Sequence, residues 1–142
     1  MFYGQFENKI DEKNRLMIPR KMREDIGVKL FIMKGYEGSL SVYKEEDFKI
    51  FFQKQQELSY TNRASRDFIR ATIGSANEVE IDKLGRIQIP TYFAFKYNLG
   101  KEVIVLGAGD HFEIWNKDAF NDYENNLESN FESVAEGLFL NK

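Results

Sequence analysis

The sequence contains no cysteine, two prolines and one histidine among its 142 residues. The lack of cysteine excludes disulfide bonds and thiolate metal sites, and it is compatible with a reducing compartment. Because proline is rare and phenylalanine occurs thirteen times, a disordered or low-complexity chain is excluded as well. His111 has no companion for metal or nucleophile chemistry, so we expect no metal and no cofactor.

Long hydrophobic runs are also missing. No stretch of about 18 apolar residues is present, and positions 1–10 hold polar and charged residues where a signal peptide needs an apolar core. We therefore expect a cytoplasmic protein with no membrane partner. Neither an enzyme nor a small-molecule substrate is expected, because the candidate acids and the histidine form no nucleophile–base pair and no carboxylate dyad.

The sequence does contain a ten-residue phrase that occurs twice. The copies are residues 10–19, IDEKNRLMIP, and residues 81–90, IDKLGRIQIP, which lie seventy-one residues apart. Both copies have an isoleucine, an aspartate, an arginine four residues after the aspartate, an apolar-x-Ile run and a closing proline. This agreement indicates an internal duplication.

The phrase has the pattern of a β-hairpin. In the second copy apolar residues alternate on both sides of a polar centre, which predicts two half-buried strands joined by a short loop. Gly85, and Asn14 in the first copy, suit a left-handed turn, and Asp11 and Asp82 suit the opening of that turn. By the same alternation, the side chain of Arg86 should point away from the buried face.

Two roles are open for the aspartate and the arginine. They could pair only with each other across the turn, as a surface ion pair worth about 0 to 1 kcal/mol, or the arginine could contact a ligand. The surroundings favour the ligand, because a simple turn clasp needs no basic cluster. The segment between positions 13 and 23 has five basic residues and no acid, namely Lys13, Arg15, Arg20, Lys21 and Arg23.

The charge is distributed unevenly along the chain. A net charge of −3 argues at first against a nucleic-acid partner. However, residues 1–36 carry eight Lys or Arg and five Asp or Glu, whereas residues 110–142 carry two and eight. The distribution predicts a basic face for an anionic partner and an acidic segment away from it, although an acidic tail can also be just a solvated helix face.

The two halves repeat one order of elements. Residues 1–58 and 74–142 each read as a strand (2–8 in the first half), the phrase, a short helix (20–26 and 91–98), two further strands and a longer helix (45–58 in the first half). Residues 59–73 have no counterpart and predict a linking helix at 62–73. The halves are expected to form one compact domain.

Two helices carry regular patterns. Arg63, Arg66 and Arg70 share one face of the linking helix, and a solvated or subunit-bridging face is a better explanation for them than DNA contact. The C-terminal helix is amphipathic, and its heptad-like apolar stripe needs a partner surface, within the subunit or on a neighbour. The stripe consists of Phe120, Tyr123, Leu127, Phe131, Val134 and Leu138.

The duplicated motif, followed each time by apolar-x-Ile-Pro, resembles the MraZ family of bacterial regulators of the division and cell-wall gene cluster. The resemblance covers essentially the whole chain. A single copy of the motif also resembles AbrB-type regulators and MazE-type antitoxins. The resemblance implies an α+β fold that is mainly a β barrel, made of two AbrB-like swapped-hairpin halves with added helices.

The resemblance also implies how the subunits assemble and what the assembled protein binds. Subunits would close into an octamer-like ring homo-oligomer. The ring would bind G-rich direct repeats in double-stranded promoter DNA of its own operon, usually as a repressor, and the protein would be associated with the nucleoid. The alternatives are a ring-forming structural or protein-interaction protein, and an antitoxin-like DNA binder with a protein partner.

The family pattern matches the two halves unevenly. Arg15 and Arg86 match the motif arginines, and Arg23 matches a basic residue of the short helix, but the second half has Ala94 there and Asn14 replaces the usual glycine. We therefore expect the first hairpin to contribute more to DNA recognition than the second. The expected DNA-binding residues are Asp11, Lys13, Asn14, Arg15, Arg20, Lys21, Arg23, Asp82, Lys83 and Arg86.

Overall fold

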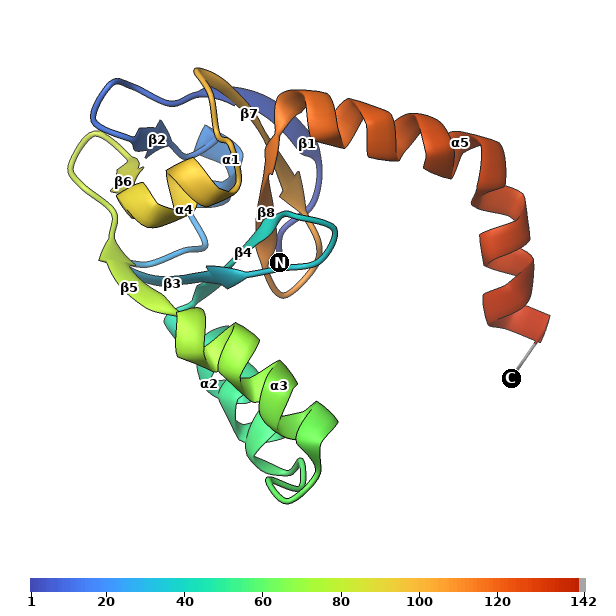
Figure 1. The fold of residues 1–142 in the computed structure, drawn as a ribbon. Helices are drawn as coiled ribbons and strands as arrows, with labels where there is room; N and C mark the ends of the chain where they lie inside the picture. The colour runs from blue at the N-terminus through green and yellow to red at the C-terminus, as the bar shows by residue number, and fades with distance from the viewer. Residues whose placement is uncertain (141–142) are drawn as a thin grey trace.

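The computed structural model describes residues 1–140, and its strands form two sheets (Figure 1). The larger sheet contains β1 (Gln5–Lys9), β3 (Lys29–Lys34), β4 (Leu40–Lys44), β5 (Asn77–Glu80), β7 (Glu102–Gly107) and β8 (Phe112–Asn116). Its spatial order is β1-β7-β8-β4-β3-β5, and all neighbours are antiparallel. The smaller sheet pairs β2 (Arg15–Met17) with β6 (Arg86–Gln88).

The two halves are interlocked. β1 of the first half pairs with β7 of the second, and β5 of the second half pairs with β3 of the first. β4 and β8 join the halves at the centre of the sheet. Exchanging β1 with β5, β3 with β7 and β4 with β8 reproduces the strand order in reverse, so the duplication in sequence is a twofold relation in space.

Each phrase loop is closed as a hairpin tip, but the strands that flank it do not pair with each other along their length. β1 and β2, which flank the first loop, are joined by a hydrogen bond from Asn8 Nδ2 to the carbonyl of Met17 at 2.6 Å and, next to the loop, by the bridge between Ile10 and Leu16. Along its length β2 pairs instead with β6 of the other half. Leu16 and Ile87 lie opposite each other in that pair, and their side chains are 0% and 1% exposed. Pairing between the halves therefore buries apolar side chains that an isolated hairpin would leave partly in water.

The predicted barrel is also not found among the described residues. β1 and β5 are the two edges of the large sheet and do not pair with each other. These strands end at Lys9 and Glu80, and the chain then turns through the phrase loops into β2 and β6. Because the chain that follows both edge strands enters the small sheet, the edges of the large sheet stay apart and that sheet remains open.

In the part of the chain that the structure describes, five α-helices accompany the sheets: α1 (Arg20–Arg23), α2 (Glu45–Gln56), α3 (Arg63–Thr72), α4 (Thr91–Lys96) and α5 (Lys117–Leu140). α1 and α4 are shorter than predicted and start directly after Pro19 and Pro90. α3 begins at its predicted place because the Asn62 side chain accepts hydrogen bonds from the backbone of Ala64 and Ser65. α2 and α3 extend from the side of the sheet that holds β3 and β5 (Figure 1).

The main hydrophobic core draws side chains from both halves. Ile18 and Ile32 of the first half and Ile89 and Val105 of the second are all fully buried within it. A smaller cluster of Ile104, Trp115 and Phe120, with Leu106 and Tyr123 packed against it, fixes the start of α5 to the sheet. Beyond that cluster α5 runs away from the body (Figure 1).

Candidate nucleic-acid interface

The first phrase loop is held by one carboxylate. Asp11 Oδ1 accepts hydrogen bonds from the backbone N–H groups of Lys13 and Arg15, both at 2.9 Å. Asp11 Oδ2 accepts a third hydrogen bond from Arg15 Nε at 2.7 Å. Asn14 closes the turn with a φ of 59°, in the left-handed region that its sequence position predicted.

The second loop has the same three hydrogen bonds to its aspartate. Asp82 Oδ1 accepts from the backbone of Leu84 and Arg86, both at 2.9 Å, and Asp82 Oδ2 accepts from Arg86 Nε at 2.9 Å. Gly85 has a φ of 86°, in the place of Asn14. The two loops are therefore two copies of one local structure.

Both carboxylates are kept ionised by these contacts. The backbone N–H of the arginine four residues on is the main reason that the pKa of Asp11 and of Asp82 lies below its usual value. The hydrogen bond and the charge of the same arginine's guanidinium lower the pKa further, while desolvation opposes the shift. Each aspartate thus shapes its loop and holds the arginine beside it.

The ion pair that the spacing allowed is present in both loops, and it leaves room for a ligand. The aspartates engage Nε, and among the described residues no hydrogen bond is made to the terminal nitrogens of either guanidinium. The side chains of Arg15 and Arg86 are 32% and 24% exposed. The clasp therefore fixes the direction of each guanidinium while its terminal N–H groups stay accessible.

Each loop is also tied to the opposite half. The backbone N–H of Ile18 donates to the carbonyl of Gly85 at 2.9 Å, and that of Ile89 donates to the carbonyl of Asn14 at 2.8 Å. Gln88 Nε2 adds a hydrogen bond to the carbonyl of Lys13. Because these bonds run between the halves, the two arginines are held in a fixed relation to each other.

Arg23 lies against the second loop, although the sequence predicted it beside the first. Its Nε donates to the carbonyl of Ile18 at 2.8 Å, and its guanidinium covers Gly85, where an added Cβ would come within 2.6 Å of it. Arg23 therefore belongs with the second loop and Arg86, not with the first loop. The basic cluster that was expected around Arg15 is in fact divided between both loops.

The contact between Arg23 and Gly85 involves the positions at which the two halves depart from the family pattern. By the twofold relation Ala94 corresponds to Arg23 and Asn14 corresponds to Gly85, so the half with the large residue on its short helix lies against the glycine of the other. Sequence reasoning missed this contact because it assigned each short helix to the loop that precedes it. The signal was the matched change in sequence: the half with arginine on its short helix has asparagine in its own loop, and the half with alanine there has glycine.

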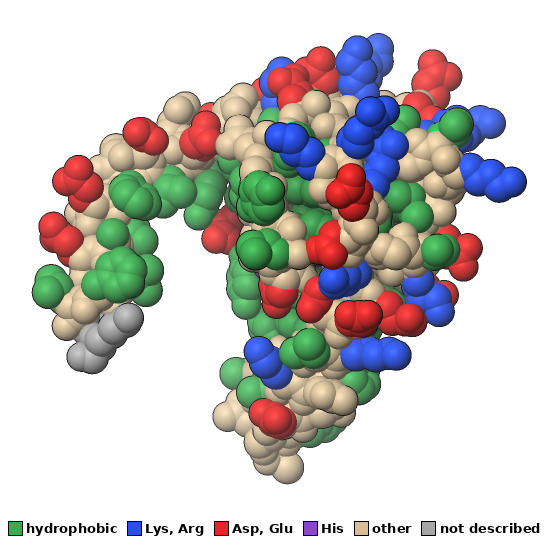
Figure 2. Space-filling model, turned by 180° about the vertical axis from the view of Figure 1, so that it is seen from behind, with side chains coloured by type: hydrophobic (Ala, Val, Ile, Leu, Met, Phe, Trp, Pro, Cys, Tyr) green, Lys and Arg blue, Asp and Glu red, His purple; other side chains and the backbone are tan. Residues whose placement is uncertain are grey.

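The other predicted basic residues lie in the phrase loops or on the short helix α1. Lys13, Arg20, Lys21 and Lys83 are exposed, and Lys and Arg side chains are most numerous on the end of the body away from α5 (Figure 2). The second half is less basic, as predicted. On α4, Tyr92 is 64% exposed and Phe95 is 85% exposed.

The three arginines of α3 are engaged locally. Arg66 Nη1 donates to the carbonyls of Tyr60 and Thr61 at 3.1 and 3.0 Å, Arg63 lies 4.0 Å from Asp67, and the Arg70 guanidinium lies over the ring of Tyr60. α3 is far from the two phrase loops in the fold (Figure 1). These arginines do not extend the basic surface around Arg15 and Arg86.

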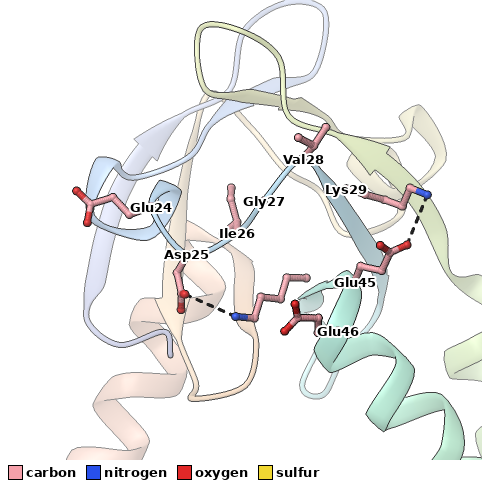
Figure 3. A pocket seen from close by; sticks show the side chains of 9 residues that line it. Glu24, Asp25, Ile26, Gly27, Val28, Lys29, Glu45 and Glu46 are labelled. Carbon is pink, nitrogen blue, oxygen red and sulfur yellow. Dashed lines mark ion pairs between the residues drawn. The ribbon is translucent and has the colours of Figure 1, made fainter.

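A hollow of about 340 Å³ beyond the end of α1 limits that basic surface on one side. Its charged lining residues are four acids and two lysines: Glu24, Asp25, Glu45, Glu46, Lys29 and Lys44. Lys44 pairs with Asp25 at 3.6 Å and Lys29 pairs with Glu45 at 3.5 Å (Figure 3). Since acids are in excess and the lysines are paired, this hollow does not suit an anionic ligand.

Residues 1–140 contain no group of three or more His, Asp or Glu side chains placed to hold a metal ion. None of the helices in this described part of the chain combines the length and the apolar character of a membrane span.

Comparison with known proteins agrees with the duplicated structure. The family model described as "MraZ protein, putative antitoxin-like" matches twice, at residues 1–71 and 72–142. The transcriptional regulator MraZ of Mesoplasma florum is 39% identical, over 100% of this chain and 99% of its own length. The proteins of the same name from Thermoanaerobacter sp. and Ligilactobacillus salivarius are 40% and 37% identical, each over 97% of this chain and 96% of their own. The chain therefore belongs to the MraZ family.

Proposed function

We propose that this chain is a sequence-specific DNA-binding transcriptional regulator that reads bases with Arg15 and Arg86. The observation that carries the proposal is the pair of identical loops, each with an arginine fixed by its aspartate through Nε. An arginine in the major groove can donate two hydrogen bonds to O6 and N7 of guanine, worth about 1 to 3 kcal/mol of discrimination. A guanidinium that is already oriented loses less entropy on binding.

The surrounding residues fit supporting roles. Lys13, Arg20, Lys21 and Lys83 are exposed and would contact phosphates, and Arg23 would add charge beside Arg86. Asp11, Asn14 and Asp82 would act through the shape of the loops. Relatives named transcriptional regulator support a regulatory role. A regulator that binds DNA would act in the cytoplasm, at the nucleoid.

Assembly and operator belong to the same proposal. The exposed stripe of α5, which includes Leu127, Phe131 and Val134, is available to join copies into an octamer-like ring. A head-to-tail ring presents identical loops in one rotational sense, and this arrangement suits direct repeats better than a palindrome. The repeats would be G-rich and would lie upstream of the protein's own operon. Binding there would repress transcription of that operon. Linkage on one ring multiplies weak contacts, so a chain with a net charge of −3 can still bind DNA well.

Fluorescence anisotropy with labelled DNA from the region upstream of its own gene tests the proposal. Arg15→Ala should weaken specific binding by roughly tenfold or more, and Arg15→Lys should fail similarly because lysine lacks the bidentate fork. Since Arg23 accompanies Arg86, we now expect Arg86→Ala to weaken binding about as much as Arg15→Ala.

Arg63→Ala is the matched control, because its side chain is 86% exposed on α3, away from the loops. An Arg15→Ala variant that melts like the wild type and binds the operator unchanged would refute base reading by this loop. A wild-type protein that binds no promoter DNA would instead favour the second candidate, a protein-interaction or antitoxin-like role for which the exposed stripe of α5 is the supporting observation.

A further inference from the structure

A second pocket lies between the outer face of the large sheet and the helices α2 and α3. Met33, Ser41 and Glu113 lie side by side across β3, β4 and β8 and form its floor. Phe51 of α2 and Phe68 of α3 contribute aromatic walls. The pocket encloses about 210 Å³ and is lined mainly by apolar surface.

Two buried hydroxyl groups in this pocket have no partner. Ser41 and Tyr43 are 5% and 6% exposed, and none of the described residues makes a hydrogen bond with either hydroxyl. Among the described residues no fully buried side-chain nitrogen or oxygen lacks a hydrogen bond, so these two oxygens keep some accessible surface, which opens into the pocket. Burial raises the pKa of Tyr43, so its hydroxyl remains a donor.

Three ionisable groups beside the pocket are already paired. His111 stacks on Tyr43 with ring centroids 4.8 Å apart, and its Nδ1 and Nε2 lie 2.8 Å from Asp110 and 3.6 Å from Glu113. Glu113 also accepts a hydrogen bond from Trp115 Nε1 at 2.9 Å. A charged ligand would find these three side chains already paired with one another and would lose its hydration.

Lys34 also lines the pocket, and none of the ion pairs among the described residues includes it. Its ammonium group lies 5.8 Å from the ring centroid of Tyr97, which is part of the core and not of the pocket. The pocket therefore presents aromatic walls and two free hydroxyls, and its one unpaired charge is held beside Tyr97.

We propose that this pocket binds a neutral molecule with one aromatic ring and one hydrogen-bonding substituent. Its ring would lie against Phe51 and Phe68, and its polar group would reach the hydroxyls of Ser41 and Tyr43. Size agrees with this class, because an apolar cavity of about 150 Å³ holds benzene, and the additional volume here admits one small substituent. The site is independent of the phrase loops and stands whether or not the chain binds DNA.

Phenol is the probe for the test, titrated into the full-length protein and followed by ligand-observed NMR. We expect saturable binding of phenol, weaker binding of toluene, which lacks the hydroxyl, and weaker binding of benzoate, which is charged. Tyr43→Phe should weaken phenol by roughly fivefold and leave toluene unchanged. Tyr3→Phe, at a 72% exposed position, is its control.

A filling substitution tests the location. Ala71→Phe on α3 should occupy the pocket and abolish phenol binding, whereas Ala64→Phe, on an exposed turn of the same helix, should not. No saturable binding of phenol to the wild type would overturn the proposal, and so would phenol binding that survives Ala71→Phe. Equal affinities of the wild type for phenol and toluene would overturn the role given to the two hydroxyls.

Discussion

At the scale of single residues, the ionisation of Asp11 and Asp82 makes the stability of the phrase loops depend on pH. The folded-state pKa of both carboxyls lies below the unfolded value of 3.8, mainly because of the backbone N–H of the arginine four residues on. A depressed folded pKa gives stability that is present above the unfolded pKa and is lost as the pH falls through the folded pKa. The phrase loops should therefore weaken in acid.

We expect the free energy of unfolding to fall below about pH 4, and to fall less steeply in an Asp11→Asn, Asp82→Asn double variant. Urea unfolding between about pH 2 and pH 6 measures this slope. Glu12→Gln, at an exposed neighbouring position, should keep the wild-type slope. If the double variant loses stability in acid as steeply as the wild type, these two carboxyls are not the groups concerned.

The backbone of the two loops gives another residue-scale prediction. Gly85 has a φ of 86° and lies under the Arg23 guanidinium, whereas Asn14 has a φ of 59° in the equivalent place. Gly85→Ala should destabilise the protein by about 1 to 2 kcal/mol, because alanine is strained at positive φ and its Cβ displaces Arg23.

Asn14→Gly is the matched variant, and it should change stability by less than about 1 kcal/mol, because glycine accepts the same φ. Thermal unfolding by circular dichroism compares the two. A Gly85→Ala variant that melts at the wild-type temperature would contradict the close contact with Arg23.

At the scale of elements, α1 and α4 are equivalent helices with different surfaces. Lys21 is exposed on α1, and its counterpart on α4 is Tyr92. Lys21→Glu should weaken binding to operator and scrambled DNA alike, and should lower the slope of log affinity against log salt by roughly 0.9 for the lost phosphate contact. A salt titration on both DNAs measures it.

The control for this charge reversal is Lys49→Glu on α2, which is exposed and lies outside the phrase loops and short helices. If the slope of log affinity against log salt is unchanged in Lys21→Glu, Lys21 on α1 does not contact the DNA phosphates. A loss confined to the operator would instead mean that Lys21 reads bases.

At the scale of the whole molecule, α5 has two parts with different roles. Phe120 is 3% exposed and packs with Trp115, whereas Phe131 and Leu138 are 61% and 66% exposed. Burial of such an apolar face is the main force available to bring copies together. A chain ending at Asn126 should therefore keep its fold and form a smaller species.

Size-exclusion chromatography with light scattering tests this, with melting by circular dichroism as the check on folding. A second variant, Phe131→Ser in the full-length chain, should shift the mass in the same direction without shortening the helix. A truncated chain that assembles to the full-length mass would show that the exposed stripe is not the contact between copies.

The structure also shows where sequence reasoning succeeds. The positive φ at Asn14 and Gly85 was predicted correctly, and α3 starts within one residue of its predicted start. The aspartate–arginine pairs, one of the two roles left open, are present in both loops. These features depend on side chains a few positions apart, whose hydrogen bonds are formed by the local chain alone. The heptad-like stripe of α5 was visible for the same reason, although its partner was not.

The sequence by itself therefore determined the duplication, the loop chemistry and the alternation that turns Leu16 and Ile87 inward. Only the tertiary structure decided that these two residues face each other, that β1 joins β7, and that Arg23 covers Gly85 instead of the first loop. The reason is physical: alternation specifies which face of a strand is buried, but not which strand covers it. That choice rests on the total apolar surface buried by two interlocked halves, and partners so far apart in the chain leave no local pattern.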